Sequence, residues 1–259
     1  MKSTEKELLQ NLFKTTYDWL NYGDDNSYKK YTFSDDVNDS QNNCVSQINS
    51  TNFESSQNDS SLTEKLSTLS NIYQEIRNCT KCPLCSYRKN TVPGMGVDNP
   101  LVLVIGEGPG QDEDEQGLPF VGKAGQLLDK MLNSISLNRK VNCYIANIVK
   151  CRPPQNRVPL LEESQNCFPY LQQQIKILQP KIILALGRTA VQNLLNTSDG
   201  INSLRGKVFK YNNIPLIATF HPSALLREEE LKRPAWEDLK QLRQLLLKID
   251  PNYDKVSKT

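Results

Sequence analysis

A short apolar run from Leu101 to Ile105 is the feature that most constrains how this chain can fold. Five apolar residues closed by Gly106 are typical of a buried strand. A loop rich in glycine, proline and acidic residues follows, and the spacing of apolar residues from Lys123 onward is helical. A strand that leads through a loop into a helix is the building unit of an α/β sheet. The loop at the carboxyl end of such a strand is therefore a candidate reaction site.

Three further apolar segments are predicted to be strands, at 142–149, 181–186 and 215–220. Segments with helical spacing separate and flank them, from residues 61–63 to 76, and at 160–179, 187–195 and 234–249. Strands that alternate with helices predict a parallel sheet that is covered on both faces. We therefore expect an α/β fold, a three-layer α/β/α domain with a central four-stranded parallel sheet.

The chain is expected to have a short leader before its main domain. The apolar spacing in residues 4–22 predicts one amphipathic helix within a 1–22 leader, which either packs on the domain or docks a protein partner. Residues 23–62 are rich in Asn, Ser, Asp and Gln, so they are predicted to be a disordered linker. The main domain is then expected at 63–250, followed by a flexible tail at 251–259.

Charge is unevenly distributed along the 259 residues. Residues 1–60 contain 5 lysines and arginines against 10 acidic residues, whereas the rest of the chain contains 26 against 19. A basic domain suits a polyanionic partner, although an ordinary solvated surface explains the same numbers. The N-terminus lacks the apolar core of a signal peptide, and no apolar run reaches the ~18 residues of a membrane span. We expect a cytoplasmic protein that does not enter a membrane.

The cysteines suggest a metal site. Cys79 and Cys82 form a CxxC pair, and fifteen residues separate Cys151 from Cys167. Four thiolates in two pairs suit either a tetrahedral zinc or an iron–sulfur cluster, and the spacing alone does not choose between them. Cys85 extends the first pair to CxxCxxC and is a rival ligand.

Four segments resemble the motifs of the family 4 uracil-DNA glycosylases, the iron–sulfur type of bacteria and archaea. In chain order they are CTKCPL (79–84), GEGPGQDEDEQGLPFVGKAGQLL (106–128), NIVKCRPPQNRVP (147–159) and TFHPSALL (219–226). The resemblance runs from about Leu66 to the C-terminus. It implies the uracil-DNA glycosylase fold and a structural [4Fe–4S] cluster, with zinc as the alternative. The implied ligands are Cys79, Cys82, Cys151 and Cys167.

The same resemblance implies a monofunctional, monomeric hydrolase of base-excision repair. Such an enzyme flips uracil out of single- or double-stranded DNA, hydrolyses the N-glycosidic bond and leaves an abasic site. By resemblance Phe120 stacks on the uracil, and its structural alternative is a loop anchor. Asn147 ends a predicted strand, and its amide can bind both O4 and N3–H of uracil, unless it only forms a turn. Gly108 lets the loop backbone approach the base.

Two residues are candidates for the chemistry itself. Glu107 directly follows the first strand, and by resemblance it is the acidic residue that stabilises the cationic sugar or positions water. His221 is the only histidine and follows the fourth strand, where a ring N–H could stabilise the departing anion at uracil O2. Glu113 matches another acidic position of the motif and is expected near uracil C5, where it excludes the methyl group of thymine. The remaining carboxylates of this loop, those of Asp112, Asp114 and Glu115, are expected to be solvated.

DNA contacts are expected from two further segments. Arg152 and Arg157 lie in a proline-rich basic loop and are predicted to bind phosphates. Leu225 or Leu226 is a candidate wedge that enters the duplex, with a place in the helical core as the equal alternative. Arg227 is predicted to hold a phosphate.

The same sequence features are compatible with other functions. A non-catalytic iron–sulfur DNA-binding module, docking a replication partner through residues 4–22, is the alternative from another class. Within the enzyme class, the nearest alternative is a related glycosylase that prefers other deaminated bases. A zinc-bearing α/β hydrolase lacks a nucleophile–base pair here, and a lyase lacks a lysine in the matched catalytic position.

Overall fold

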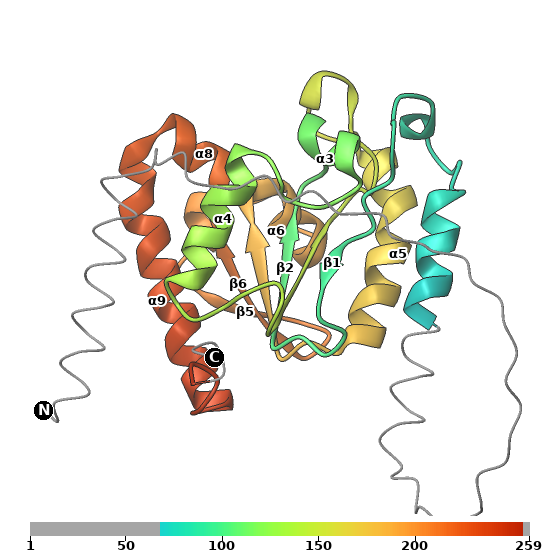
Figure 1. The fold of residues 1–259 in the computed structure, drawn as a ribbon. Coiled ribbons are helices and arrows are strands. Elements are labelled where there is room, and N and C mark those ends of the chain that lie inside the picture. Colours follow the sequence, from blue (N-terminus) through green and yellow to red (C-terminus); the bar gives the residue numbers. More distant parts are fainter. Residues whose placement is uncertain (1–67, 256–259) are drawn as a thin grey trace, which may run out of the picture.

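One six-stranded sheet organises residues 68–255, the part of the chain that the computed structural model describes (Figure 1). Four strands run parallel in the order β3-β2-β4-β6, as predicted, and a short antiparallel strand is added at each edge. The strands are β1 (Met95–Gly96), β2 (Val102–Gly106), β3 (Cys143–Asn147), β4 (Ile182–Leu186), β5 (Val208–Tyr211) and β6 (Ile214–Thr219). The predicted four-stranded sheet is therefore the centre of a larger one.

The two edge strands were missed for different reasons. β1 has only two residues, which is too short for an alternating pattern. β5 forms a hairpin with β6 around Asn212 and Asn213, whose φ angles of 47° and 67° are left-handed. Two left-handed residues form the type I′ turn that matches the twist of a two-residue hairpin. The Asn-Asn pair was thus a sequence signal for β5.

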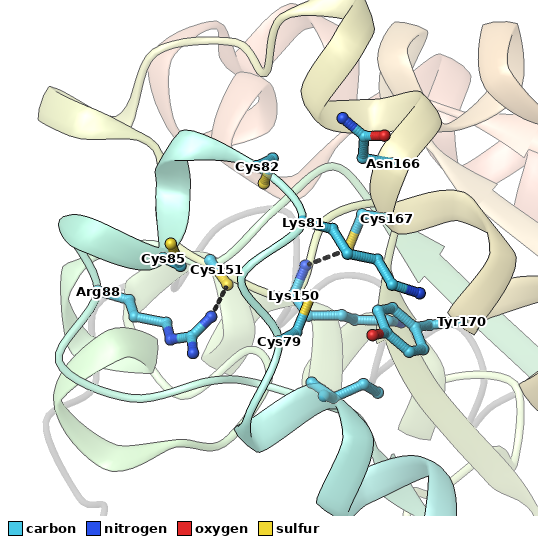
Figure 2. Close-up of a pocket in the computed structure, with 11 residues that line it drawn as sticks. Cys79, Lys81, Cys82, Cys85, Arg88, Lys150, Cys151, Asn166, Cys167 and Tyr170 are labelled. Carbon is cyan, nitrogen blue, oxygen red and sulfur yellow. Dashed lines mark hydrogen bonds between the residues drawn. The ribbon is translucent and has the colours of Figure 1, made fainter.

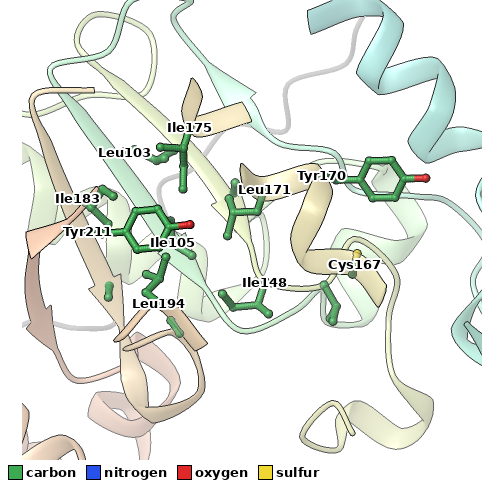
Figure 3. Close-up of a cluster of buried hydrophobic side chains, with 14 of the residues drawn as sticks. Leu103, Ile105, Ile148, Cys167, Tyr170, Leu171, Ile175, Ile183, Leu194 and Tyr211 are labelled. Atoms are coloured by element: carbon green, nitrogen blue, oxygen red, sulfur yellow. The ribbon is translucent and has the colours of Figure 1, made fainter. Parts of the chain in front are cut away.

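Helices cover both faces of the sheet (Figure 1). They are a helix over 68–77, α3 (Gln111–Gln116), α4 (Lys123–Asn133), α5 (Leu161–Leu178), α6 (Gly187–Leu195), α7 (Ile201–Leu204), α8 (Pro222–Arg227) and α9 (Lys232–Ile249), with 3-10 turns η1 (Pro83–Ser86), η2 (Pro154–Asn156) and η3 (Glu229–Leu231). The 68–77 helix, α5 and α6 pack on one face, where Figure 3 shows the buried side chains. The opposite face is covered by α4, α8 and α9. This is the expected three-layer arrangement.

The register of the parallel strands brings the candidate residues to one edge. Every residue of β2, β3 and β4 is buried, as expected for strands covered on both faces. Gly106 pairs with Asn147, and Leu186 pairs with Thr219. The residues that follow these positions, including Glu107 and His221, therefore leave the sheet at its carboxyl edge, where α/β proteins bind ligands.

Some expectations concern parts of the chain at the limits of the structure. The leader helix of 1–22 and the linker of 23–62 lie outside the described residues. Tyr253 belongs to the predicted flexible tail, yet it is buried and its hydroxyl donates to the Ile135 carbonyl at 2.9 Å. The packed domain thus extends at least to residue 253. Within residues 68–255, no helix combines the length and apolar character needed to cross a bilayer.

Candidate functional site: an open cavity and a cysteine pocket

An open cavity of about 660 Å³ lies at the carboxyl edge of the sheet. Its volume is in the range of small-molecule sites. The cavity brings together all six residues predicted to touch uracil or act in the chemistry: Glu107, Gly108, Glu113, Phe120, Asn147 and His221. They come from the loop after β2, the end of β3 and the turn after β6, so the fold assembles what the chain separates.

Gly106 brings the side chains of Asn147 and Phe120 together. A Cβ atom on this residue would lie 2.5 Å from Asn147 Oδ1 and 2.6 Å from Phe120 Cζ, so a larger residue would displace both. Asn147 is only 1% exposed, and its Oδ1 is buried without a hydrogen-bond partner among the described residues. Buried acceptors are normally satisfied. This oxygen therefore fits a donor supplied by a ligand.

Glu113 ties the loop together from within. Its Oε1 accepts the backbone N–H groups of Val121 and Gly122 at 2.8 and 3.0 Å, and Oε2 accepts the N–H of Gly110 at 3.0 Å. Hydrogen bonds to a carboxylate are stronger than neutral ones. Glu113 thus fixes both sides of the loop that carries Phe120. Its predicted role against thymine stays a prediction.

The expectation that Asp114 is a solvated carboxylate is wrong. Its side chain is buried, and Oδ1 accepts the backbone N–H groups of Lys89 and Asn90 at 2.9 and 3.2 Å. These bonds anchor α3 to the segment that leads into β1. Four acidic residues follow one another at 112–115, and this run does not reveal which of them faces inward.

Arg139 holds the backbone of the Phe120 loop and was not found from the sequence. Its guanidinium donates to the carbonyls of Pro119 and Phe120 at 2.8 and 3.0 Å, and it pairs with Asp129 at 2.8 Å. Phe120 has φ of 54°, a left-handed conformation that is rare for a bulky residue. The arginine lies outside every motif, so only the fold shows that it supports this conformation.

The imidazole of His221 is neutral, and a hydrogen bond from Ser223 fixes its orientation. It caps α8, and its Nδ1 accepts the backbone N–H of Ser223 at 3.2 Å. The proton of the neutral ring is then on Nε2. Burial lowers the pKa of His221 to about 4, with a smaller contribution from Arg227. The imidazole ring lies 5.6 Å from the Phe120 ring, and both side chains line the same cavity.

Glu107 is held by a residue that the sequence analysis missed. The hydroxyl of Thr189, on the first turn of α6, donates to Glu107 Oε2 at 2.5 Å. Thr189 is itself tied to its helix, because Asn193 donates to its carbonyl at 2.8 Å. Oε1 of Glu107 has no hydrogen-bond partner among residues 68–255. One carboxylate oxygen is thus fixed and the other remains for a water or a substrate.

The predicted phosphate contacts differ in their surroundings. Arg157 lines the cavity, but it forms a bidentate pair with Glu163 at 2.7 and 2.8 Å. Arg152 donates to Asn156 at 2.7 Å and does not line the cavity. Arg227 is exposed and lines the cavity. Their roles toward DNA stay predictions.

The assignment of Leu225 to the DNA surface needs correction. Leu225 is fully buried, and it packs in the core between α8 and the sheet. Its neighbour Leu226 is 46% exposed. Because successive residues of a helix point in different directions, only Leu226 can meet a duplex without unfolding α8.

A second pocket gathers the cysteines (Figure 2). It is lined by all four predicted ligands and by the rival Cys85: Cys79, Cys82, Cys85, Cys151 and Cys167. They come from the turn after the 68–77 helix, from η1, from the segment after β3 and from α5. As they stand, no three Cys, His or acidic side chains of residues 68–255 form a group that could hold a single metal ion.

The surroundings of these sulfurs suit metal-bound thiolates. The Arg88 guanidinium donates to Cys151 Sγ at 3.2 Å, and the backbone N–H of Lys150 donates to Cys167 Sγ at 3.3 Å. Burial raises the pKa of the Cys151 thiol to about 11 and also raises that of Cys167. Thiols with raised pKa values lose their protons near neutral pH only when a bound metal compensates the charge, and hydrogen-bond donors to the sulfurs orient such ligands. The donor set fits a thiolate-bound metal group.

Comparisons with known proteins agree with this geometry. Residues 93–240 match the family model of the Uracil DNA glycosylase superfamily. A Type-4 uracil-DNA glycosylase of Pyrobaculum aerophilum is 42% identical over 179 residues, which cover 66% of this chain and 91% of the relative. Its counterpart in Thermotoga maritima is 40% identical over 181 residues, covering 68% and 94%. A Type-5 uracil-DNA glycosylase of P. aerophilum is 31% identical over 180 residues, covering 57% and 79%.

Proposed function

The chain belongs to the uracil DNA glycosylase superfamily, and we propose that it is a monofunctional uracil-DNA glycosylase of type 4. It takes a uracil nucleotide out of DNA, hydrolyses the bond between N1 and C1′, and leaves an abasic site for base-excision repair. The names of its relatives specify this substrate, and the cavity is of a size to accept one flipped base.

The observation that carries the proposal is the unpartnered Oδ1 of Asn147, buried beside the Phe120 ring. Uracil N3–H would donate to this oxygen, and the amide N–H would donate to uracil O4. Cytosine has no proton on N3 and presents an amine in place of O4. Cytosine would therefore leave two buried groups unsatisfied, which is the strongest kind of discrimination that a polar site achieves.

His221 would stabilise the leaving base. When the C1′–N1 bond breaks, its electron pair goes to the uracil ring, and negative charge appears on O2. The Nε2–H of the neutral imidazole would donate to that oxygen. Because burial lowers the pKa of His221 to about 4, the ring stays neutral at pH 7 and keeps its proton during the reaction. One such donor is worth on the order of 10²–10³ in rate.

Glu107 would act on the sugar side of the bond. Its carboxylate, fixed through Thr189, would stabilise positive charge at C1′ and orient a water molecule through Oε1. The water oxygen bonds to C1′, and its proton passes to the carboxylate or to solvent. General base and electrostatic roles of this kind contribute about 10²–10⁴ in rate.

We also propose that Cys79, Cys82, Cys151 and Cys167 hold a [4Fe–4S] cluster with a structural role. When bound, the cluster supplies coordinate bonds that cross-link separate segments of the chain. Zinc is the alternative, and Cys85 is the rival ligand because it lines the same pocket. Iron content and visible absorbance of the purified protein separate the two metals.

The remaining expectations keep the status of predictions. They are binding of single- and double-stranded DNA, a monomeric state, a location in the cytoplasm and a protein partner for residues 4–22. The exposed Arg227, which lines the cavity, and the exposed Leu226 support the prediction of DNA binding.

The deciding experiment measures base release from a synthetic oligonucleotide with a single uracil, in EDTA. Wild type is compared with Glu107→Ala, His221→Ala and, as a matched control, Glu237→Ala on the exposed side of α9. We expect release by wild type and the control, loss of at least about 100-fold in the other two, and an unbroken abasic strand. Undiminished release in both site variants would move the chemistry elsewhere. No release from uracil, hypoxanthine or xanthine would favour the non-catalytic DNA-binding module.

A further inference from the structure

Lys150 is a buried lysine that the proposed chemistry does not use. It is 1% exposed, and its Nζ donates to the Asn147 carbonyl at 2.9 Å and to Gln174 Oε1 at 2.7 Å. No Asp or Glu within residues 68–255 forms a salt bridge with it. Burying a charge without a carboxylate partner costs several kcal/mol unless other groups compensate it. A lysine in this position therefore needs an explanation.

The segment 147–151 connects the cavity at the carboxyl edge of the sheet, the proposed base cavity, to the cysteine pocket. It begins with Asn147 in one and ends with Cys151 in the other. Between them, the backbone N–H groups of Ile148 and Val149 donate to the carbonyls of Gly106 and Glu107, at 3.0 and 3.2 Å. The segment thus continues β3 alongside the catalytic loop, and any shift of it moves both sites.

Lys150 is the one residue of this segment that bonds toward both pockets. Its backbone N–H donates to Cys167 Sγ, as Figure 2 shows, while its ammonium group reaches back to the Asn147 carbonyl. Gln174 completes the network, because its Nε2 donates to the Pro93 carbonyl at 2.9 Å.

We infer that Lys150 is a positioning residue: it holds the main chain of Asn147 so that the amide faces the base. This inference rests on the proposed glycosylase function and adds a residue to it. Without the ammonium, the Asn147 carbonyl and Gln174 Oε1 lose a buried donor. The end of β3 then loses one of its restraints, and base reading weakens while the DNA-facing surface is untouched.

Lys150→Met tests this, because methionine keeps the length of the side chain and removes its charge and donors. Lys232→Met is the matched control, since Lys232 is also buried but lies on α9 and pairs with Glu229. Both variants are compared as iron-loaded proteins with wild type. We expect Lys150→Met to bind free uracil, measured as an inhibitor, about tenfold more weakly, and to discriminate less well between uracil and cytosine. Its affinity for abasic DNA should stay within about twofold, because the phosphate contacts are unchanged.

Uracil binding and discrimination equal to those of Lys232→Met would overturn the positioning role.

Two outcomes are kept apart by the controls. If wild type itself releases no uracil, the proposed function fails, whereas normal release by wild type with unchanged uracil binding in Lys150→Met overturns only the positioning role. If Lys150→Met does not fold, Gln174→Met replaces it, since it removes the other acceptor that holds the ammonium in place. Uracil inhibition should then weaken by about threefold at unchanged abasic-DNA affinity, and inhibition equal to wild type would overturn the inference.

Discussion

The base cavity and the cysteine pocket lie at opposite ends of one five-residue segment, yet they are built on different principles. The cysteine pocket draws its residues from four segments, which the proposed metal group would cross-link through coordinate bonds. The base cavity is shaped by hydrogen bonds, such as those of Glu113 and Arg139 to the loop backbone. Loss of one metal ligand should therefore abolish metal binding altogether, whereas loss of one hydrogen bond should only reduce activity and stability in part.

The largest effect is expected at the cysteine pocket. Cys151→Ser should give a colourless protein with at least about 4 kcal/mol less stability, because a lost metal site is among the few causes of so large a change. Iron content, visible absorbance and thermal unfolding measure this. Cys85→Ser is the matched control and should stay coloured. A stable, coloured Cys151→Ser protein would instead identify Cys85 or another group as a ligand.

Asn147→Asp should alter the base cavity and leave the cysteine pocket intact. A carboxylate replaces the amide donor to uracil O4, so the ratio of uracil to cytosine release should fall by roughly 100-fold. Single-turnover release from matched oligonucleotides measures the ratio, and iron content should equal that of wild type. Asn133→Asp, at the exposed end of α4, is the control. An unchanged ratio would remove Asn147 from base reading.

Arg139→Met probes the graded behaviour directly. It leaves the Pro119 and Phe120 carbonyls without their donor, so we expect uracil release to slow by about tenfold and stability to fall by about 1–3 kcal/mol. Arg243→Met is the control, because within residues 68–255 Arg243 pairs with Asp254 and not with the loop that carries Phe120. If both variants behave alike, Arg139 only stabilises the fold and does not position Phe120.

The smallest effect is expected from pH near neutrality. Because the folded pKa of His221 is about 4, below the ordinary 6.5, the unfolded chain takes up the proton first as pH falls. The contribution of His221 to the free energy of unfolding should therefore be constant above pH 6.5 and decrease toward pH 4. His221→Gln should lose that slope. The only histidine also gives unambiguous NMR signals, and a titration midpoint near 6.5 in the folded protein would contradict a buried, neutral donor.

The sequence predicted the frame of the molecule well where apolar patterns are long. All four parallel strands were found, and the helices expected at 160–179 and 234–249 are α5 and α9. β1 and β5 were missed because edge strands are short and only partly buried. Leu225 was placed on the DNA surface because an exposed and a buried leucine are indistinguishable in so short a helix. Asp114 was misjudged for the same reason, since its burial depends on the distant backbone of 89–90.

The sequence by itself determined the layered fold, the four cysteines, and the acidic, aromatic, amide and histidine candidates. These features are local, since each depends on residue type, spacing or position at a strand end. Only the tertiary structure decided which groups support them. Thr189 on Glu107, Arg139 behind Phe120 and Lys150 behind Asn147 are each brought into contact by packing and carry no motif of their own. Such contacts depend on how strands and helices lie together, and a single sequence does not encode that in any local pattern.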